Sequence, residues 1–269
     1  MADPLVRCEG VVKIYASAVG HVQALRGVDL TIDHGELVAL VGPSGSGKSS
    51  LLRIIAGLDE ASAGSVTVDG VDFARVARSR RRKVRSRLLS HVFQQPSDNL
   101  LEHLTAIEQV ERVARRRGTG AAAALAALEQ VRLDHRHTHR PDELSGGEQQ
   151  RLAFARAIVG RPALVIADEP TAELDTATTH AIIDVIAELN AAGTTILLAT
   201  HDPVALERVG HVVTLRDGSV AGVRRHGIER AAIDSTGRLQ LPPDVRHHFP
   251  DASARLDWDD GDQHLVARP

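Results

Sequence analysis

Residues 42–49 read GPSGSGKS and place the strongest restriction on how this chain folds. They match the pattern G-x-x-x-x-G-K-[ST], in which a glycine-rich loop follows a buried strand and opens into a helix. The preceding run, 37–41, is short and apolar, as is typical of a buried strand, and residues 50–57 have the pattern of a helix that a glycine ends. Strand, glycine-rich turn and helix in this order predict an α/β fold with a polyphosphate site at the turn.

Each part of this loop has a chemical role toward a nucleotide. Glycines allow the backbone to turn closely around phosphates so that its N–H groups point at them, and the helix N-terminus adds its positive dipole end. We expect Lys48 to reach the β- and γ-phosphates and the Ser49 hydroxyl to hold Mg²⁺. The residues predicted to contact the nucleotide here are Gly42, Pro43, Ser44, Gly45, Ser46, Gly47, Lys48, Ser49 and Ser50.

Composition limits the class of protein. The chain has 269 residues, enough for one large or two modest domains, and its 43% apolar and 25% charged residues are typical of a soluble globular protein. The single cysteine, Cys8, excludes an intrachain disulfide framework and a cysteine-based zinc site. No apolar run of about eighteen residues occurs, and the first residues lack the pattern of a signal peptide. We therefore expect a cytoplasmic chain that reaches a membrane only through a partner.

Apolar runs and helical periodicities alternate along most of the chain. This alternation predicts a mostly parallel sheet with helices. Apolar residues at helical spacing in 105–160 predict a helical insert between two halves of the sheet domain, and 224–227 are interpreted as a linker to a separate unit. Strands are predicted at 5–15, 37–41, 64–70, 89–93, 163–167, 194–199, 212–215 and 219–223, and helices at 176–192 and 203–208.

Two further motifs carry groups suited to a bound nucleotide. Residues 163–170 read ALVIADEP, which places Asp168 and Glu169 at the carboxyl end of a strand, where open α/β sheets bind their ligands. Asp168 suits the Mg²⁺ shell, and Glu169 suits a general base that polarises the attacking water. Residues 144–150 read LSGGEQQ, which builds a second anion site at a helix N-terminus, although Ser-Gly-Gly alone is only a helix cap. The residues assigned to this second site are Ser145, Gly146, Gly147 and Glu148.

Together, GPSGSGKSS, LSGGEQQ and VIADEP resemble the motifs of the nucleotide-binding subunits of the ATP-binding cassette (ABC) family, over about residues 5–224. The resemblance implies a P-loop ABC ATPase core, a mixed sheet with helices, joined to an α-helical subdomain. It implies ATP and Mg²⁺ as cofactors. It also implies that two copies of the chain sandwich two ATP molecules head to tail. The segment LSGGEQQ, called the signature in this family, would then complete the phosphate site of the other copy. Hydrolysis would then open the dimer and drive a conformational change in a partner.

The resemblance implies roles for four residues outside these motifs. Gln94 matches a glutamine between the two lobes that senses Mg²⁺ and faces the permease, with Gln95 the less favoured choice. Tyr15 matches the aromatic residue that stacks on adenine, or is a core tyrosine at a strand end. Asp175 matches a loop crossing the dimer interface, caps the helix that follows, or does both. His201 matches a switch histidine at the γ-phosphate, or is only a neighbour of a helix cap.

Three phrases narrow the resemblance to a subgroup. Residues 20–30, IAGLD (55–59) and VFQQ (92–95) are similar to ATPases that serve lipoprotein release, macrolide and peptide export, and the cell-division permease complex. Two departures occur: Glu102-His103 stands where a proline is common, and Glu173 stands where a small residue is common. Both lie at surfaces that would face the permease or the second subunit, so they bear on the partner and not on the ATP chemistry.

Related classes fit less well. Chromosome-maintenance ATPases insert a long coiled coil between the phosphate loop, here 42–49, and the signature, here 144–150. In this chain Lys48 and Ser145 are under about a hundred residues apart, and the sequence between them has no sustained heptad repeat. Translation-factor relatives carry two cassettes in one chain. A non-catalytic binding module would not combine Lys48 with Asp168, Glu169 and His201. A soluble ABC ATPase that regulates without a permease is the alternative function.

Two charged regions remain. Residues 78–87 form a basic block suited to anionic lipid head groups or nucleic acid, or a solvated helix face, which we favour because the block lacks aromatic residues for stacking on bases. Residues 232–246 resemble the AbrB-type swapped-hairpin regulators, with a last strand near Leu265-Val266. From residue 226 onward eight acidic residues outnumber five arginines, a balance that disfavours DNA. We expect no nucleic-acid partner, and interpret the tail as a dimerising or regulatory appendage, with a DNA-binding regulator the weaker alternative.

The sequence thus predicts an ABC ATPase domain at 1–224, its helical subdomain at about 96–160, and an AbrB-like appendage at 225–269. We expect a subunit that powers export or transmembrane mechanical signalling through a separate integral-membrane permease, peripheral at the inner face of the cell membrane. The predicted catalytic residues are Lys48, Gln94, Glu169 and His201, and the predicted Mg²⁺ ligands are Ser49, Gln94 and Asp168.

Overall fold

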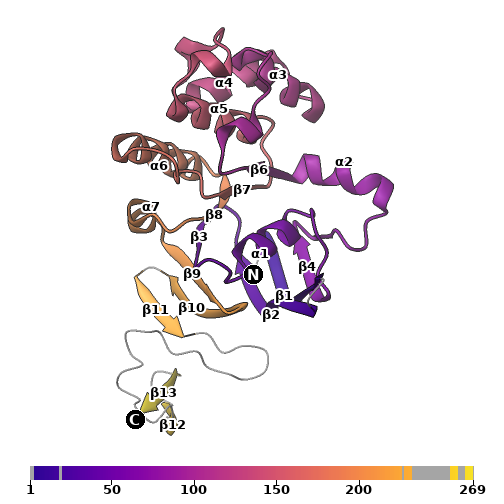
Figure 1. Ribbon diagram of the computed structural model, residues 1–269, viewed down its shortest axis with the longest axis vertical. Helices are drawn as coiled ribbons and strands as arrows, with labels where there is room; N and C mark the ends of the chain where they lie inside the picture. Colours follow the sequence, from indigo (N-terminus) through magenta and orange to yellow (C-terminus); the bar gives the residue numbers. More distant parts are fainter. Residues whose placement is uncertain (1–2, 18–19, 226, 232–254, 260–263, 269) are drawn as a thin grey trace.

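A seven-stranded sheet forms the central layer of the computed structural model, which describes residues 3–17, 20–225, 227–231, 255–259 and 264–268. The strand order is β11-β10-β9-β3-β8-β7-β6 (Figure 1). The strands are β3 (Leu37–Val41), β6 (Leu89–Val92), β7 (Leu164–Asp168), β8 (Thr195–Ala199), β9 (His211–Arg216), β10 (Ser219–Arg225) and β11 (Ile228–Ala231). Strands β9, β3, β8, β7 and β6 pair in parallel, and β10 and β11 pair antiparallel. The predicted mostly parallel sheet with helices is confirmed.

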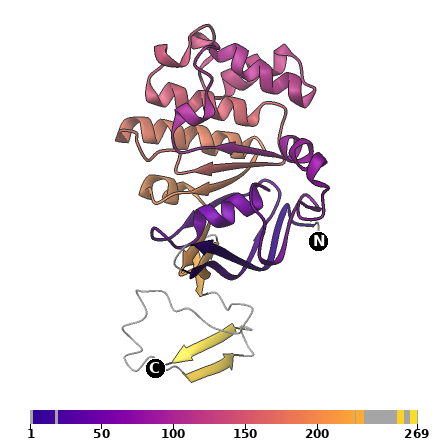
Figure 2. The ribbon, with the colours of Figure 1, turned by 45° about the vertical axis from the view of Figure 1, so that its right-hand side comes forward.

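Both faces of this sheet are buried. In β7, Leu164 and Ile166 belong to one hydrophobic core, and Val165 and Ala167 to the other, as alternation along a strand requires. The first core includes side chains of α1 (Lys48–Ile55), and the second includes those of α5 (Gly146–Ile158) and α6 (Thr176–Ala191). Figure 2 shows α6 and the helices beyond it covering one side of the sheet. A strand with both faces buried explains the continuous apolar runs in the sequence.

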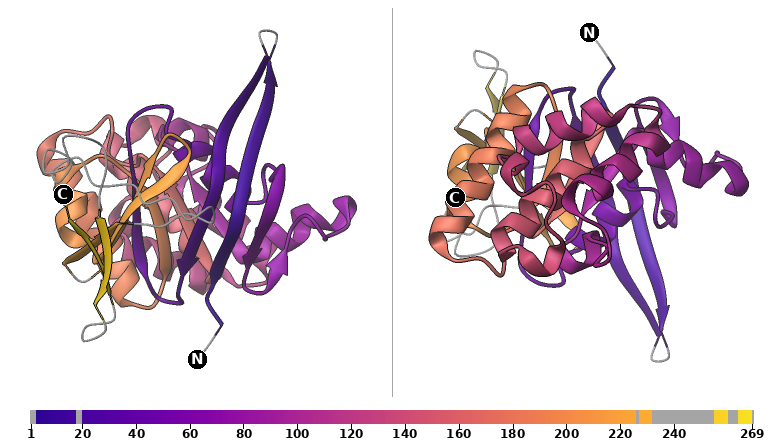
Figure 3. Two further views of the ribbon diagram at one scale, coloured as in Figure 1. Left: turned by 90° about the horizontal axis from the view of Figure 1, so that it is seen from below. Right: turned by 90° about the horizontal axis from the view of Figure 1, so that it is seen from above.

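A second, antiparallel sheet was not predicted from the sequence. It has the order β2-β1-β4-β5, built from β1 (Val6–Ser17), β2 (Gly20–Ile32), β4 (Ala63–Val68) and β5 (Val71–Asp72). Strands β1 and β2 extend as a long ribbon beyond the body of the molecule (Figure 3, left). Buried residues of this sheet share one core with α1, so the sheet supports the helix that follows the phosphate loop.

The predicted helical insert is confirmed as a lobe of three short 3₁₀ helices and three α-helices, namely α5 with α3 (Ala106–Arg117) and α4 (Ala121–Gln130). The helix α3 begins with a capping box between Thr105 and Glu108 and ends at Gly118, whose φ is 77°. Side chains of α3, α4 and α5, such as Val110, Leu128 and Phe154, are fully buried in one core. The 3₁₀ helices of the lobe are η1 (Pro96–Asn99), η2 (Asp134–Arg136) and η3 (Pro141–Glu143).

Three peripheral segments test the remaining expectations. The basic block forms the helix α2 (Arg78–Leu88), which leads into β6, and α7 (Pro203–Arg208) forms as predicted. The predicted linker at 224–227 is wrong, because β10 turns there into β11 and the sheet continues to Ala231. Linker-like composition and a hairpin turn both use glycine and polar residues, and only pairing with β10 separates them.

Residues 232–246, which carry the AbrB-like pattern, lie outside the described residues, as do residues 247–254. The described part of the tail is a hairpin of β12 (Arg255–Asp259) and β13 (His264–Arg268). The strand predicted near Leu265-Val266 therefore exists within β13, whereas β12 was not predicted. Across the described ranges, no helix combines the length and the apolar character needed to cross a membrane.

Candidate active site

Three neighbouring strands bring the phosphate loop (42–49), the pair Asp168-Glu169 and His201 to one edge of the sheet. Strands β3, β8 and β7 lie side by side and parallel, so their carboxyl ends meet. The phosphate loop follows β3, His201 follows β8 after one residue, and Asp168 ends β7 with Glu169 directly after it. This convergence depends on the strand order, which the sequence motifs do not contain.

Two glycines of the phosphate loop are required by close packing. A Cβ at Gly42, where φ is 151°, would lie 2.2 Å from the carbonyl oxygen of Leu215. A Cβ at Gly47, where φ is 102°, would lie 2.5 Å from the carbonyl oxygen of Ala24. The loop therefore presses against β9 and β2, and no side chain fits at these two positions without moving backbone.

Lys48 lies over its own loop. Its Nζ donates to the carbonyl oxygen of Gly42 at 2.7 Å and to that of Pro43 at 3.2 Å. The Ser46 N–H donates to the Pro43 carbonyl at 3.1 Å, while the Ser46 hydroxyl is buried without a hydrogen-bond partner. A buried hydroxyl with unused hydrogen-bonding capacity and an ammonium among carbonyl oxygens both suit a polyanion in this loop. Four other loop residues predicted to contact the nucleotide are exposed, namely Pro43, Ser44, Gly45 and Ser49.

The acidic pair at the end of β7 has an unusual environment. Burial raises the pKa of Asp168, the adjacent Glu169 raises it further, and Lys48 acts in the opposite direction. Glu169 has a left-handed backbone, with φ of 46°, held by a 2.9 Å hydrogen bond from its N–H to the carbonyl oxygen of Ala199. Its Oε2 lies 2.9 Å from Nδ1 of His201. The structure thus brings Glu169 and His201 into direct contact.

The signature residues Ser145 and Glu148 lie at the N-terminus of α5 and not at the sheet edge with Asp168 and Glu169. Ser145 caps α5, and Glu148 returns the contact through a 2.9 Å hydrogen bond from the Ser145 N–H. Donation from Ser145 lowers the pKa of Glu148 and outweighs the effect of burial, and Arg136 adds to the lowering. Figure 1 places α5 in the upper part of the molecule and α1 in the lower part, with β6 and β7 between them. The helix that carries the second anion site therefore lies in a different part of the molecule from α1, which follows the phosphate loop.

Asp175 caps α6, as one of its two predicted roles requires. Its carboxylate accepts the Thr178 N–H at 2.9 Å and the Thr178 hydroxyl at 2.8 Å, and these hydrogen bonds lower its pKa. The helix ends of α5 and α6 are in close contact, because a Cβ at Gly147 would lie 2.3 Å from Cγ2 of Thr178. At Gly146 the nearest atom would be 3.7 Å away, so packing does not explain that glycine.

Gln94 is not brought to the acidic pair by any described contact. It is exposed after β6, and its neighbour Gln95 donates to Glu173 at 3.5 Å. Beside this segment lies a hollow of about 320 Å³ with the exposed ring of Phe93 at its edge. The hollow is lined by apolar and cationic side chains, among them Leu58, Arg85, Leu89, Phe93, Val113 and Arg116.

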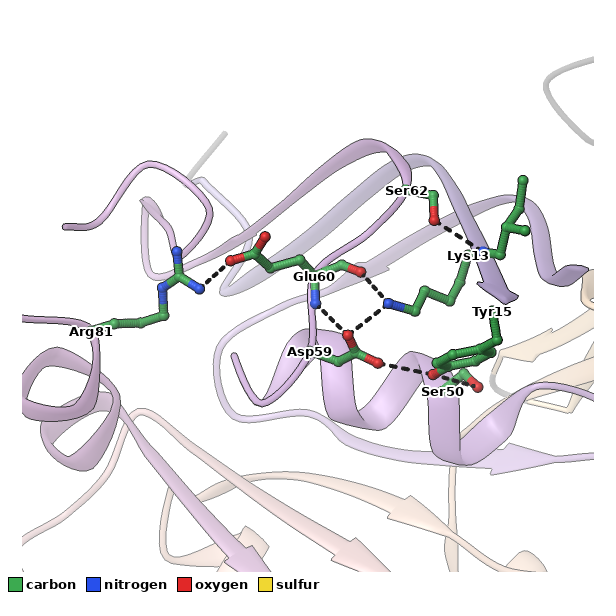
Figure 4. A network of polar contacts seen from close by, with 8 residues as sticks. Lys13, Tyr15, Ser50, Asp59, Glu60, Ser62 and Arg81 are labelled. Carbon is green, nitrogen blue, oxygen red and sulfur yellow. Dashed lines mark hydrogen bonds and ion pairs between the residues drawn. The ribbon is translucent and has the colours of Figure 1, made fainter. Parts of the chain in front are cut away.

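Tyr15 lies on β1, half-buried, with its hydroxyl turned to α1. Its Oη donates to Oδ2 of Asp59 at 2.9 Å and lies 3.3 Å from Oγ of Ser50 (Figure 4). Asp59 and its ion-pair partner Lys13 were not predicted as site residues. Their separation by 46 residues leaves no local pattern that could have shown the contact.

Comparison with known proteins identifies the family. The sequence pattern of the ABC transporter family matches residues 25–172. The lipoprotein-releasing system ATP-binding protein LolD of Pseudoalteromonas translucida is 40% identical over 225 residues, covering 82% of this chain and 96% of LolD. The macrolide export ATP-binding/permease protein MacB 1/2 of Paracoccus denitrificans is 40% identical over 232 residues, covering 85% of this chain and 34% of that protein. The dimeric post-hydrolysis structure of the ATP-binding cassette MJ0796 bound to ADP and Pi aligns with a TM-score of 0.72 and 34% identity, over 82% of this chain and 98% of that one.

The chain belongs to the ABC transporter family, as one of its ATP-binding and ATP-hydrolysing subunits. The subgroup predicted from the sequence is confirmed, because relatives from lipoprotein release and macrolide export match most of the chain.

Proposed function

We propose that this ATPase powers export, or transmembrane mechanical signalling, through a separate integral-membrane permease that holds it at the inner face of the membrane. The observation that carries the proposal is the meeting of the phosphate loop, the pair Asp168-Glu169 and His201 at one sheet edge. The names of the relatives, a lipoprotein-releasing system and a macrolide export protein, support a transport role. The alternative, regulation without a permease, has no comparable observation in its favour.

The side chains at this edge divide the work of ATP hydrolysis. Lys48 would leave the carbonyl oxygens of Gly42 and Pro43 and neutralise the β- and γ-phosphates. Glu169 would accept a hydrogen bond from the attacking water, orient it toward the γ-phosphate and take its proton. His201, in contact with the same carboxylate, would hold it and reach the γ-phosphate. Positioning and charge neutralisation are the main requirements of phosphoryl transfer.

The residues at the strand ends also suit Mg²⁺. Hard divalent cations prefer oxygen ligands, which Ser49, Asp168 and Gln94 supply. Asp168 is partly buried beside the carboxylate of Glu169, and both burial and the neighbouring charge raise its pKa. A divalent cation would be attracted by these two carboxylates and would relieve the repulsion between them. When bound, the ion would neutralise charge on the phosphates. Gln94 would join only after the loop behind β6 moves.

Two copies of the chain are proposed to close on ATP. The capped N-terminus of α5, with Ser145, Gly146 and Gly147, offers N–H groups to an anion, and α5 lies apart from α1, which follows the phosphate loop. A second copy placed head to tail would bring this helix end to the ATP on the first. Asp175 lies on the neighbouring helix end, α6, and would come to the same interface. The dimeric structure of the related cassette supports the association of two copies.

The hollow beside Phe93 is the proposed contact for the permease. Phe93 is 40% exposed and Leu58 is 39% exposed, and both line the hollow together with arginines. Large exposed apolar side chains gathered around a hollow are typical of a protein interface. Phe93, which lines the hollow, is the residue directly before Gln94 in the chain. A movement of the permease at Phe93 would therefore be passed directly to the proposed Mg²⁺ ligand Gln94.

The domain organisation follows the same proposal, with one adjustment. The ATPase domain, with its helical subdomain at about 96–160, is proposed to end at β11 and not at residue 224, because β11 completes the sheet. The AbrB-like appendage would begin after Ala231 and strengthen the dimer that forms without nucleotide. Deletion of 232–269 should weaken that dimer in sedimentation equilibrium and leave ATP binding intact. An unchanged dimer would remove the proposed role of the tail.

Affinity capture tests the permease. The Glu169→Gln chain should hold MgATP and recover an integral-membrane protein from detergent-solubilised membranes of its source. Phe93→Asp in this background should lose that protein while still binding ATP. Leu125→Asp is the matched control, because Leu125 is 45% exposed on α4 and does not line the hollow. Capture of soluble partners alone would instead support regulation without a permease.

A further inference from the structure

Lys13, Tyr15 and Asp59 form a connected polar network beside the first turn of α1 (Figure 4). The Nζ of Lys13 lies 2.6 Å from Oδ1 of Asp59 and donates to the Glu60 carbonyl oxygen at 2.7 Å. The Tyr15 hydroxyl donates to the other Asp59 oxygen at 2.9 Å and lies 3.3 Å from Oγ of Ser50. The network therefore joins β1, the loop after α1, and the residue that follows the phosphate loop.

The network is shielded from solvent and its charges are satisfied. The side chains of Lys13 and Asp59 are 11% and 22% exposed. Burial alone would raise the pKa of Asp59, but hydrogen bonds from Lys13, from the Glu60 N–H and from Tyr15 outweigh burial and lower that pKa. Asp59 is thus an ionised anchor that accepts on both oxygens. Charge-assisted hydrogen bonds of this kind hold their partners in one geometry.

One face of the Tyr15 ring is occupied by this network. The Lys13 ammonium lies over the ring, 4.8 Å from its centroid, which is a cation–π contact. Lys13 and Tyr15 are two residues apart on β1 and lie on the same side of the strand, while Ile14 between them is 44% exposed. A planar base can therefore stack only on the ring face opposite Lys13.

We propose that Lys13 and Asp59 are positioning residues for the nucleotide base: they fix the angle of the Tyr15 ring and direct its free face to the base. The inference rests on the proposed adenine contact of Tyr15 and adds the residues that set its orientation. A side chain already held in its bound orientation loses little conformational freedom when the ligand arrives. The network also contacts Ser50, which directly follows the phosphate loop. The parts of the chain that would bind the base and the phosphates are therefore in contact.

Binding of ADP compared with inorganic tripolyphosphate separates the base from the phosphates. The Kd for ADP is measured by isothermal titration calorimetry, and displacement of ADP gives the Kd for tripolyphosphate. Lys13→Met and Asp59→Asn should raise the Kd for ADP about three- to tenfold, the effect of freeing one aromatic side chain. The Kd for tripolyphosphate should change by less than about twofold, within the effect of one surface interaction. Arg7→Met is the matched control, because it removes an exposed ion pair with Glu9 on the same strand.

A double-mutant comparison tests whether Lys13 acts through Tyr15. In a Tyr15→Ala background, Lys13→Met should cause no further loss of ADP affinity, because the ring it orients is absent. Further loss there, or an equal loss of tripolyphosphate affinity, would overturn the inference. Tyr15→Phe removes only the hydroxyl and keeps the ion pair. Tyr15→Phe should raise the Kd for ADP by about twofold. It tests the hydrogen bond between Tyr15 and Asp59 even where Lys13→Met lowers the stability of the protein.

The failures of the two proposals are distinguishable. If Tyr15→Ala leaves the Kd for ADP unchanged, Tyr15 is not a base contact, and the positioning role falls with it. If Tyr15→Ala weakens ADP but Lys13→Met, Asp59→Asn and Tyr15→Phe do not, the base contact stands and the positioning role is refuted.

Discussion

Replacing Gly147 with alanine should destabilise the chain, although alanine is normally favoured over glycine in a helix. A Cβ at this position would lie 2.3 Å from Cγ2 of Thr178, whereas carbon atoms are best placed about 3.5–4.0 Å apart. Thr178 is not free to turn away, because its hydroxyl donates to Asp175 at 2.8 Å and its N–H donates to the same carboxylate at 2.9 Å. The substitution must therefore break that cap or separate α5 from α6.

The expected loss follows from three contributions. Overpacking by one methyl group costs about 1–3 kcal/mol, and a disturbed N-cap costs about 1 kcal/mol. Alanine recovers about 1 kcal/mol of helix propensity. The net decrease in the free energy of unfolding is about 2 kcal/mol, or a Tm lower by about 4–8 °C for a domain of this size.

Urea unfolding followed by far-ultraviolet circular dichroism measures this loss. Gly146→Ala is the control, because its Cβ would have no atom closer than 3.7 Å, and it should be as stable as the natural chain or more so. Thr178→Ser added to Gly147→Ala should restore most of the stability, since it removes the clashing methyl group and keeps the capping hydroxyl. Equal stability of the two alanine variants, or no recovery with Thr178→Ser, would refute the packing argument.

Two other perturbations have expected outcomes that follow from buried groups. Burial lowers the pKa of His91 to about 4, with Arg53 and Arg85 contributing, so the unfolded chain takes up a proton below about pH 6.5 that folded His91 does not. Stability should fall as the pH decreases from about 6.5 to 4, by up to about 3 kcal/mol from this residue, and His91→Leu should flatten the decrease in urea titrations at each pH; an unchanged slope would show that His91 is not responsible. Arg117 donates to four backbone carbonyl oxygens, those of Ser86 in α2, Leu89 in β6, Ala157 in α5 and Val159 just after α5. Arg117→Leu should lower the free energy of unfolding by about 2–4 kcal/mol in urea titrations, because it leaves these acceptors unsatisfied; a loss below about 1 kcal/mol, the value of a single hydrogen bond, would contradict that role.

The parts of the fold that the sequence predicted are those with local signals. The phosphate loop, the acidic end of β7 and the helical lobe each depend on residues within a few turns or strand positions of one another. The separate antiparallel sheet was not predicted, because alternation along a strand does not say which sheet it joins. The hairpin from β10 to β11 was interpreted as a linker for the same reason, since its partner strand decides the matter.

The candidate site divides in the same way. Motifs supplied Lys48 and Glu169, and the family resemblance supplied His201, but only the order of the strands places His201 against Glu169. The left-handed backbone of Glu169 has no sequence signal, since it is maintained by a hydrogen bond to β8. The contact between Lys13 and Asp59 spans 46 residues and follows from packing alone.

Each ATP is proposed to lie between the phosphate loop of one copy and the Ser145 helix end of another. The most direct test mixes two inactive variants, Lys48→Ala and Ser145→Arg, and measures ATP hydrolysis. In a head-to-tail dimer of the two variants, one site combines an intact Lys48 with an intact Ser145, and the other site carries both changes. If two copies share each ATP in this way, the mixture should hydrolyse ATP although neither variant does so alone. A mixture no more active than its separate components would contradict it, and would place both groups in the site of a single chain.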